Sequence, residues 1–166
     1  MALSNGTDMS KPNGSPLSSA ELAFLRELAR TKTRFMIVGV GSAVLQGADA
    51  VTQDLDLWFE SIADEKIADA ARAAGGVFAW RANPPMLSGV GFDQIDIVQH
   101  CDGLRSFKDE YAKAIEIRLE DFTVKVLPLA RVIASKAAAN RPKDRAVLPA
   151  LLAAASATGS GPAKKG

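Results

Sequence analysis

The amino-acid sequence predicts one α/β (α+β) domain in which helices flank a mixed β-sheet. Three features of the sequence support this prediction. Short apolar runs have the length and composition of buried strands, stretches with helical spacing alternate with them, and segments rich in glycine and proline separate the two kinds of element. With 166 residues, 48% of them hydrophobic and 23% charged, the chain can bury one core of its own.

The first predicted helix begins at Ser18 or Ser19 and ends in the basic stretch at Arg30. Either serine can cap the helix, and Glu21 in the first turn complements the positive end of the helix dipole. Leucines recur at helical spacing after it, so one stripe of this helix should lie on the core.

A predicted buried strand, 35–40, follows, because this segment is apolar, partly β-branched and bounded by glycine. The pair Gly41-Ser42 is expected to turn the chain into a short helix, 43–46, which ends at Gly47. The chain should therefore pass from the sheet into a helix at this glycine-serine turn.

The next predicted strand begins with two carboxylates. Alternation along the strand places Leu55, Leu57 and Phe59 on the core face. It leaves Asp54, Asp56 and Trp58 on the opposite face. Two such carboxylates have Cβ atoms roughly 7 Å apart, which suits two divalent cations that both need oxygen ligands. Trp58 is expected to pack rather than to stack on a base.

The remaining elements continue this alternation along the chain. In order they are a helix capped by Ser61 and closed at Gly75-Gly76, a strand 77–80, a loop 81–91, a strand 92–99, a helix 104–112, two strands 115–119 and 123–127, and two helices 128–140 and 143–157. Within the strand 92–99, Asp96 lies on the face opposite Ile95 and Ile97. The last helix is apolar nearly all round, so we expect it to be buried in the core or at a dimer interface.

The two ends of the chain differ in composition from the rest. Residues 1–17 should form a disordered segment and residues 158–166 a flexible tail, which leaves 18–157 as the folded domain. No signal-peptide pattern and no run of about 20 apolar residues is present. A net charge of +1 gives no global attraction to nucleic acid or membrane, and a single cysteine excludes an internal disulfide. We therefore expect a soluble, cytoplasmic protein with no membrane partner.

Several of these residues together resemble the signature of the nucleotidyltransferase superfamily related to DNA polymerase β. The matching elements are Gly41-Ser42, Asp54-x-Asp56 and, in a later strand, Asp96. The resemblance implies a nucleotidyltransferase-like fold in which the helix at Gly41-Ser42 holds a nucleoside triphosphate. It also implies that Asp54 and Asp56 bind two Mg²⁺ ions, and that Asp96 binds the catalytic ion and helps to activate an acceptor hydroxyl.

Elementary physical chemistry agrees with these implied roles. Backbone N–H groups at a helix N-terminus suit a phosphate chain, and glycine lets that backbone approach closely. In-line phosphoryl transfer depends on positioning and on charge neutralisation, which hard cations on carboxylates supply. Three carboxylates that converge without a cation would repel one another and raise the pKa of at least one of them.

A further match lies at Ser135-Lys136 and at Arg141-Pro-Lys-Asp144. These segments resemble helices of the smaller bacterial branch of the superfamily, which includes nucleotidyltransferases of abortive-infection systems. That resemblance implies that Lys136, Arg141 and Lys143 lie near the nucleotide. The alternative is that Asp144 only complements a helix dipole and that Lys136 is solvated.

The function implied by the resemblance is Mg²⁺-dependent transfer of a nucleoside monophosphate from an NTP, such as ATP, to a hydroxyl of an acceptor. The acceptor would be RNA, such as tRNA, or a small molecule. The alternative is a non-catalytic or partner-dependent nucleotide-binding module, such as one component of a toxin–antitoxin pair. Little sequence outside 35–145 remains to bind an acceptor, so a homodimer or a partner protein could complete the site.

Two other kinds of site fit the sequence less well. Gly39-Val-Gly41 after a strand is typical of a dinucleotide-binding βαβ unit, but Val44 occupies the third glycine position of that motif. The aspartates also come at the beginning of the second strand, where a ribose-binding acid is not expected. His100-Cys101 has no cysteine or histidine nearby in the sequence, so we do not expect a zinc site there.

Overall fold

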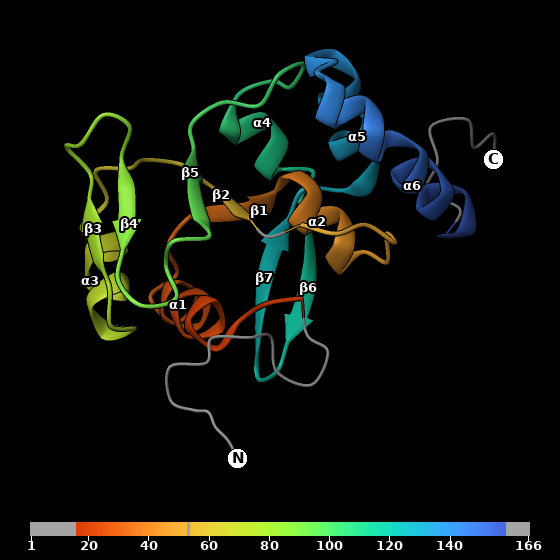
Figure 1. Ribbon diagram of the computed structural model, residues 1–166. Helices are drawn as coiled ribbons and strands as arrows, with labels where there is room; N and C mark the ends of the chain where they lie inside the picture. Colours follow the sequence, from red (N-terminus) through yellow and green to blue (C-terminus); the bar gives the residue numbers. More distant parts are fainter. Residues whose placement is uncertain (1–15, 53, 159–166) are drawn as a thin grey trace.

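A five-stranded mixed β-sheet with helices on both faces forms the centre of the structure (Figure 1). The structure is a computed structural model and describes residues 16–52 and 54–158. The strands of this sheet are β1 (Phe35–Val38), β2 (Leu55–Phe59), β5 (Ile95–Val98), β6 (Ile115–Leu119) and β7 (Phe122–Val126). They lie in the order β5-β2-β1-β7-β6. The predicted fold class, a mixed sheet flanked by helices in one small domain, is confirmed.

The directions of the strands exclude the dinucleotide-binding alternative. β1 is antiparallel to β2 and β7 is antiparallel to β6, whereas β2 is parallel to β5 and β1 is parallel to β7. A dinucleotide-binding βαβ unit would need β1 and β2 to be parallel. The mixed sheet instead brings β2 beside β5, where Asp56 and Asp96 are neighbours in register.

Helices cover both faces of this sheet (Figure 1). They are α1 (Ser19–Arg30), α2 (Gly39–Leu45), α3 (Glu65–Ala73), α4 (Phe107–Tyr111), α5 (Leu129–Ala139) and α6 (Pro142–Thr158). α1 and α3 pack on one face, where Phe24 and Ile67 belong to a first hydrophobic cluster. α2, α4, α5 and α6 pack on the other face around a second cluster, which includes Val132 and Leu151.

Alternation along the strands decides which face carries the polar residues. All four residues of β1 are buried, because both of its faces are covered. On β2, Leu57 packs in the first cluster and Trp58 in the second, so Asp56 faces α5 and α6 as the sequence predicted. Asp96 lies on the same face of β5, since its neighbour Ile97 packs against the first cluster.

Helix α1 is capped as expected. Glu21 N donates to Ser18 Oγ at 3.2 Å, and Ser18 N donates to Glu21 Oε1 at 2.8 Å. This reciprocal capping box satisfies two backbone N–H groups that a helix start leaves without an intrahelical partner. Leu17, just before the cap, packs in the first cluster together with Leu22.

The limits of the folded domain differ slightly from the prediction. Leu17 is only 4% exposed, so the packed part of the chain begins one residue before the predicted boundary at 18. Thr158 still belongs to α6, and its hydroxyl donates to Ala154 O at 3.1 Å. Residues 1–15 and 159–166, which we expected to be disordered or flexible, lie outside the described residues.

The turn from the first strand into α2 comes earlier than predicted. β1 ends at Val38, and α2 begins at Gly39. Gly39 has a φ of +68°, a conformation that residues with a side chain rarely adopt. The predicted strand 35–40 is therefore too long, and Gly41-Ser42 lies inside the helix rather than at the turn.

The cap of α3 also differs from the prediction. Asp64 is the N-cap, and its carboxylate accepts a hydrogen bond from Lys66 N at 3.0 Å. Ser61, which we expected to be the cap, accepts from Ala63 N at 3.2 Å in the turn before the helix. Both residue types favour N-cap positions, so the sequence pattern did not distinguish them.

A short hairpin occupies part of the predicted loop 81–91. β4 (Met86–Ser88) pairs in antiparallel fashion with β3 (Val77–Ala79) and forms a separate two-stranded sheet. The prolines before β4 and the glycines after it are typical of loops, and three residues are too few to show an alternating pattern. The sequence pattern therefore did not predict β4.

Helix α6 is buried on one side only. Leu151, Ala154 and Ala155 pack in the second cluster, whereas Leu152 is 43% exposed. The prediction of a buried helix is thus correct for the face toward the core. No helix in the described part of the chain is both long enough and apolar enough to cross a membrane.

The packing of α6 predicts different effects for two adjacent leucines. Leu151→Ala should lower the free energy of unfolding by about 2–5 kcal/mol, because it leaves a cavity in the second cluster. Leu152→Ala is the matched control and should change it by about 0.5 kcal/mol or less, since that side chain is largely exposed. Urea denaturation measures both values, and equal losses would contradict the docking of α6.

Candidate functional site

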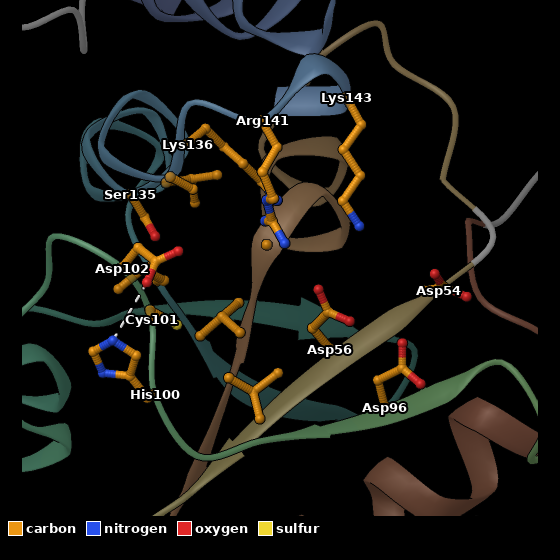
Figure 2. Close-up of a pocket in the computed structure, with 16 residues that line it drawn as sticks. Asp54, Asp56, Asp96, His100, Cys101, Asp102, Ser135, Lys136, Arg141 and Lys143 are labelled. Carbon is orange, nitrogen blue, oxygen red and sulfur yellow. Dashed lines mark ion pairs between the residues drawn. The ribbon is translucent and has the colours of Figure 1, made fainter. Parts of the chain in front are cut away.

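One pocket brings most of the predicted site residues together (Figure 2). It has a volume of about 260 Å³ and lies between strands β1, β2 and β5 and helices α5 and α6. The predicted residues that line it are Asp54, Asp56, Asp96, Lys136, Arg141 and Lys143. The three aspartates, from the strand side, form what we call the acidic wall, and the three cationic residues, from the helix side, form the basic wall.

The acidic wall follows from the register of two parallel strands. Asp56 on β2 is the direct partner of Asp96 on β5. Because neighbouring strands lie about 4.8 Å apart and both side chains are on the same face, the two carboxylates are neighbours. Asp54 precedes β2 and is exposed, and Thr52 Oγ1 donates to its carbonyl at 3.1 Å. Two of the aspartates are therefore fixed by the sheet, and the third lies at its edge.

Burial and mutual repulsion make the charged forms of Asp56 and Asp96 unfavourable. Burial raises the pKa of Asp56 to about 6, with further contributions from the charges of Asp96 and Asp54. Lys136 and Lys143 act in the opposite direction on the pKa of Asp56. Burial also raises the pKa of Asp96, followed by the charge of Asp54. The predicted repulsion is present, but the loss of solvent is the larger cause.

Gly39 makes room for Asp56, a role that we did not predict from the sequence. A Cβ atom at Gly39 would clash with Asp56 Oδ2, and the backbone there is left-handed with φ +68°. Gly39 lines the pocket at the start of α2. Gly39 lies inside the predicted strand 35–40, and a glycine within an apolar run is a signal for such a turn, because glycine adopts backbone conformations that other residues rarely do.

Gly41 and Ser42 do not line this pocket. Ser42 is fully buried, and its hydroxyl donates to Leu127 O at 2.5 Å. Gln46 reinforces this contact, because Gln46 Nε2 donates to Leu127 O at 2.8 Å and Gln46 Oε1 accepts from Leu129 N at 2.9 Å. The Ser42 side chain therefore joins α2 to the start of α5, and Gly39 takes the place at the pocket that we expected for Gly41-Ser42.

The basic wall comes from α5, from the turn after it and from α6. Lys136 lies on α5, Arg141 lies between the two helices, and Lys143 lies in the first turn of α6. Figure 2 shows the Arg141 and Lys143 side chains pointing into the pocket toward Asp56. Asn140 ends α5 in a left-handed conformation, with φ 52°, and so allows the sharp change of direction. This turn brings cations from two helices to one wall.

The loop after β5 adds residues for which we predicted no role from the sequence. His100, Cys101 and Asp102 line the pocket, and His100 Nε2 lies 3.4 Å from Asp102 Oδ1. Burial raises the pKa of the Cys101 thiol to about 12, so it stays protonated and is a poor nucleophile. These residues continue directly from the strand that carries Asp96, which is the signal that could have placed them here.

The donor set of the acidic wall fits Mg²⁺ that arrives with a phosphate substrate. Among the described residues, no three His, Cys, Asp or Glu side chains are close enough to hold a metal ion by themselves. Mg²⁺ sites in proteins commonly use one or two carboxylates, several waters and substrate phosphates rather than an all-protein cage. Asp56 and Asp96 provide such a pair, and a cation would relieve the unfavourable burial of their charges.

The chain has the fold of nucleotidyltransferases. No protein-family model and no curated protein matches its sequence. The crystal structure of ANT(2″)-Ia in complex with adenylyl-2″-tobramycin is similar with a TM-score of 0.56 at 12% identity, over 82% of this chain and 86% of that chain. A solution structure of the antibiotic-resistance factor ANT(2″)-Ia gives a TM-score of 0.57 at 11% identity, over 84% of this chain and 83% of that chain.

The raised pKa of Asp56 predicts a pH-dependent gain in stability from Asp56→Asn. The pKa is about 6 in the folded chain and 3.8 as the ordinary value, so the folded state holds the proton more tightly. The protonated Asp56 carboxyl therefore contributes stability that is fully present below about pH 4 and is lost as the pH rises through about 6. With Mg²⁺ removed by a chelator, Asp56→Asn should therefore be more stable than the wild type at pH 7, by about 1–2 kcal/mol.

Urea denaturation between pH 4 and pH 8 measures this difference. The gain from Asp56→Asn should shrink toward zero as the pH falls to about 4, where the Asp56 carboxyl is neutral in the wild type. Asp49→Asn, a change in an exposed loop, is the matched control. A gain that is the same at every pH would contradict the burial of a charged Asp56.

Two glycine substitutions separate backbone strain from the clash with Asp56. Gly39 and Gly47 both have positive φ, at +68° and +100°, but only a Cβ at Gly39 meets another side chain. Gly39→Ala should therefore lower the free energy of unfolding by about 1–3 kcal/mol more than Gly47→Ala does. Denaturation of both variants measures this, and equal losses would mean that Asp56 moves aside freely.

Proposed function

We propose that this chain is a Mg²⁺-dependent nucleotidyltransferase that transfers a nucleoside monophosphate from an NTP to a hydroxyl of an acceptor. The observation that carries the proposal is the pocket itself, in which the register-paired Asp56 and Asp96 face Lys136, Arg141 and Lys143. Carboxylates opposite cations are the arrangement that a metal–triphosphate complex needs, because one wall attracts the metal and the other the phosphates. The shared fold with ANT(2″)-Ia supports the same reaction class.

The basic wall would bind and orient the triphosphate. Arg141 offers a planar group with several N–H donors, and Lys136 and Lys143 offer compact charges. Gly39 would add close backbone approach at the start of α2, since it has no side chain and lines the pocket. These contacts hold the α-phosphorus in place for in-line attack, which is the main task of a protein in phosphoryl transfer.

The acidic wall would bind the metal and accept the proton of the acceptor hydroxyl. Asp56 and Asp96, with Asp54 at the edge, would hold Mg²⁺, which when bound supplies charge neutralisation for the phosphate oxygens. Asp96 is the register partner of Asp56 and would accept the proton of the acceptor hydroxyl. In the proposed step the acceptor oxygen bonds to the α-phosphorus, the bond to pyrophosphate breaks, and the hydroxyl proton passes to Asp96.

The acceptor is proposed to be either a small molecule or an RNA, such as tRNA. ANT(2″)-Ia is described in complex with adenylyl-2″-tobramycin, so the fold accommodates a small-molecule acceptor there. The resemblance of Lys136 and the segment Arg141 to Asp144 to proteins of abortive-infection systems keeps a cellular RNA among the acceptors to be tested. A homodimer or a partner protein would supply the rest of the acceptor site in either case.

A second candidate function is that of a nucleotide-binding module that does not transfer the nucleotide by itself, such as one component of a toxin–antitoxin pair. It rests on the basic wall, whose three cations could bind the phosphates of an NTP whether or not transfer follows. Such a module would bind Mg²⁺-NTP through the basic wall without transferring the nucleotide. A partner could then complete the site.

Labelled NTPs provide the direct test of the proposal. The wild type is incubated with Mg²⁺, each of the four NTPs, and either cellular RNA including tRNA or a panel of hydroxyl-bearing small molecules. We expect transfer of label to one acceptor class, and a loss of about 100-fold or more in rate for Asp56→Asn and Asp96→Asn. Asp121→Asn, a paired aspartate on the opposite side of the sheet from the pocket, is the matched control.

Calorimetry separates the two candidates. Binding of Mg²⁺-ATP or another Mg²⁺-NTP together with label transfer supports the enzyme, whereas binding without transfer to any acceptor supports the binding module. Transfer at equal rates by the wild type and both site variants would contradict catalysis by the acidic wall.

A further inference from the structure

Asp144 is a charged side chain buried behind the basic wall. It is 1% exposed, and its Oδ2 accepts from Arg141 Nε at 2.6 Å and from Arg141 N at 3.1 Å. Its Oδ1 accepts from Arg141 Nη2 at 3.2 Å and lies 3.5 Å from Lys136 Nζ. The bonds from Arg141 are the main reason that the pKa of Asp144 falls to about 2, so the carboxylate is charged at neutral pH.

A capping role explains only part of this arrangement. The bond from Arg141 N satisfies one backbone N–H group at the start of α6, as an acidic residue in the first turn commonly does. Such a role needs no burial and no side-chain partners. The remaining contacts of Asp144 all go to the guanidinium of Arg141 and the ammonium of Lys136, both of which line the pocket.

The carboxylate ties together cations from two different elements. Lys136 comes from α5 and is 16% exposed as a side chain, whereas Arg141 comes from the turn and is 52% exposed. Arg141 uses Nε and Nη2 on Asp144, which leaves Nη1 for a ligand in the pocket. Asp144 thus fixes the direction of a long, exposed side chain that would otherwise occupy many rotamers.

We propose that Asp144 is a positioning residue that holds Lys136 and Arg141 in the geometry that binds the triphosphate. This inference rests on the proposed function, because it assumes that a nucleoside triphosphate occupies the pocket. Asp144 itself does not touch the nucleotide. Its contribution is preorganisation, which removes the cost of ordering both cations when the phosphates bind.

Removing the charge of Asp144 changes the affinity for a polyanion in opposite directions under the two possible roles of this residue. If Asp144 only cancelled part of the positive charge, Asp144→Asn would add net positive charge and tighten the binding of a polyanion. If Asp144 positions the cations, Asp144→Asn loosens both of them and weakens binding. The direction of the change therefore distinguishes the two roles, and a role in packing alone predicts no change in affinity.

Calorimetry with Mg²⁺-tripolyphosphate and Mg²⁺-ATP tests the direction. We expect Asp144→Asn to weaken both by about tenfold, and to change the affinity for the uncharged nucleoside adenosine little. Asp109→Asn is the matched control, since Asp109 on α4 also pairs with an arginine, Arg105, at 3.2 Å, and neither residue lines the pocket. Unchanged or tighter binding of tripolyphosphate by a folded Asp144→Asn variant would overturn the proposal.

A second variant keeps the test valid if Asp144→Asn does not fold. Arg141→Lys retains the charge but loses the forked pair of bonds to Asp144, and because the Arg141 side chain is half-exposed the change leaves no cavity in the core. We expect weaker tripolyphosphate binding from this variant as well, and affinity equal to that of the wild type would overturn the proposal. In the Arg141→Lys background, Asp144→Asn should have a smaller effect than alone, because both changes act on one contact.

The same experiment distinguishes this inference from the proposed function. If the wild type binds neither tripolyphosphate nor ATP with Mg²⁺, the proposed function fails and the role of Asp144 fails with it. If the wild type binds both and Asp144→Asn binds equally well, only the role of Asp144 fails.

Discussion

The pairing of β2 with β5 in parallel register is the constraint on which the site depends. It places Asp56 beside Asp96 on one face of a sheet whose faces are both covered by helices. Asp56 is half-buried at this position and Asp96 is exposed on the edge strand β5, and loss of solvent contact raises the pKa of each carboxyl. The raised pKa of Asp56 means that its charged form costs stability, and in the proposed function a bound cation would offset that cost.

The rest of the second face compensates for these charges. Lys136 and Lys143 lower the pKa of Asp56, and they come from the two helices that close the pocket. Asp144 in turn holds Lys136 and Arg141 from behind, so that charge alternates from the strands through the basic wall to a buried carboxylate. The acidic wall, the basic wall and Asp144 thus each lie next to charges of opposite sign. Charges in a partly buried pocket need such partners, because burial alone makes them unfavourable.

Helix α2 connects the sheet to the helices that carry the cations. Its first residue, Gly39, leaves space for Asp56, and its buried Ser42 bonds to the carbonyl of Leu127 just before α5. Gln46 bonds to the same carbonyl and to the first amide of α5. Helix α2 thus contacts both the strand that carries Asp56 and the start of the helix that carries Lys136.

The sequence by itself determined the class of the fold, the alternation that puts Asp54, Asp56 and Asp96 on one face, and most strand and helix positions, because these depend on local periodicity and capping. It did not determine the left-handed turn at Gly39 or the hairpin of β3 and β4, since neighbouring glycines, prolines and caps look alike in a sequence. Only the tertiary structure decided which strands are neighbours, that Ser42 faces the core and that Asp144 lies behind the basic wall. Those facts depend on contacts between residues far apart in the chain or across a tight turn, where local patterns carry no information about direction.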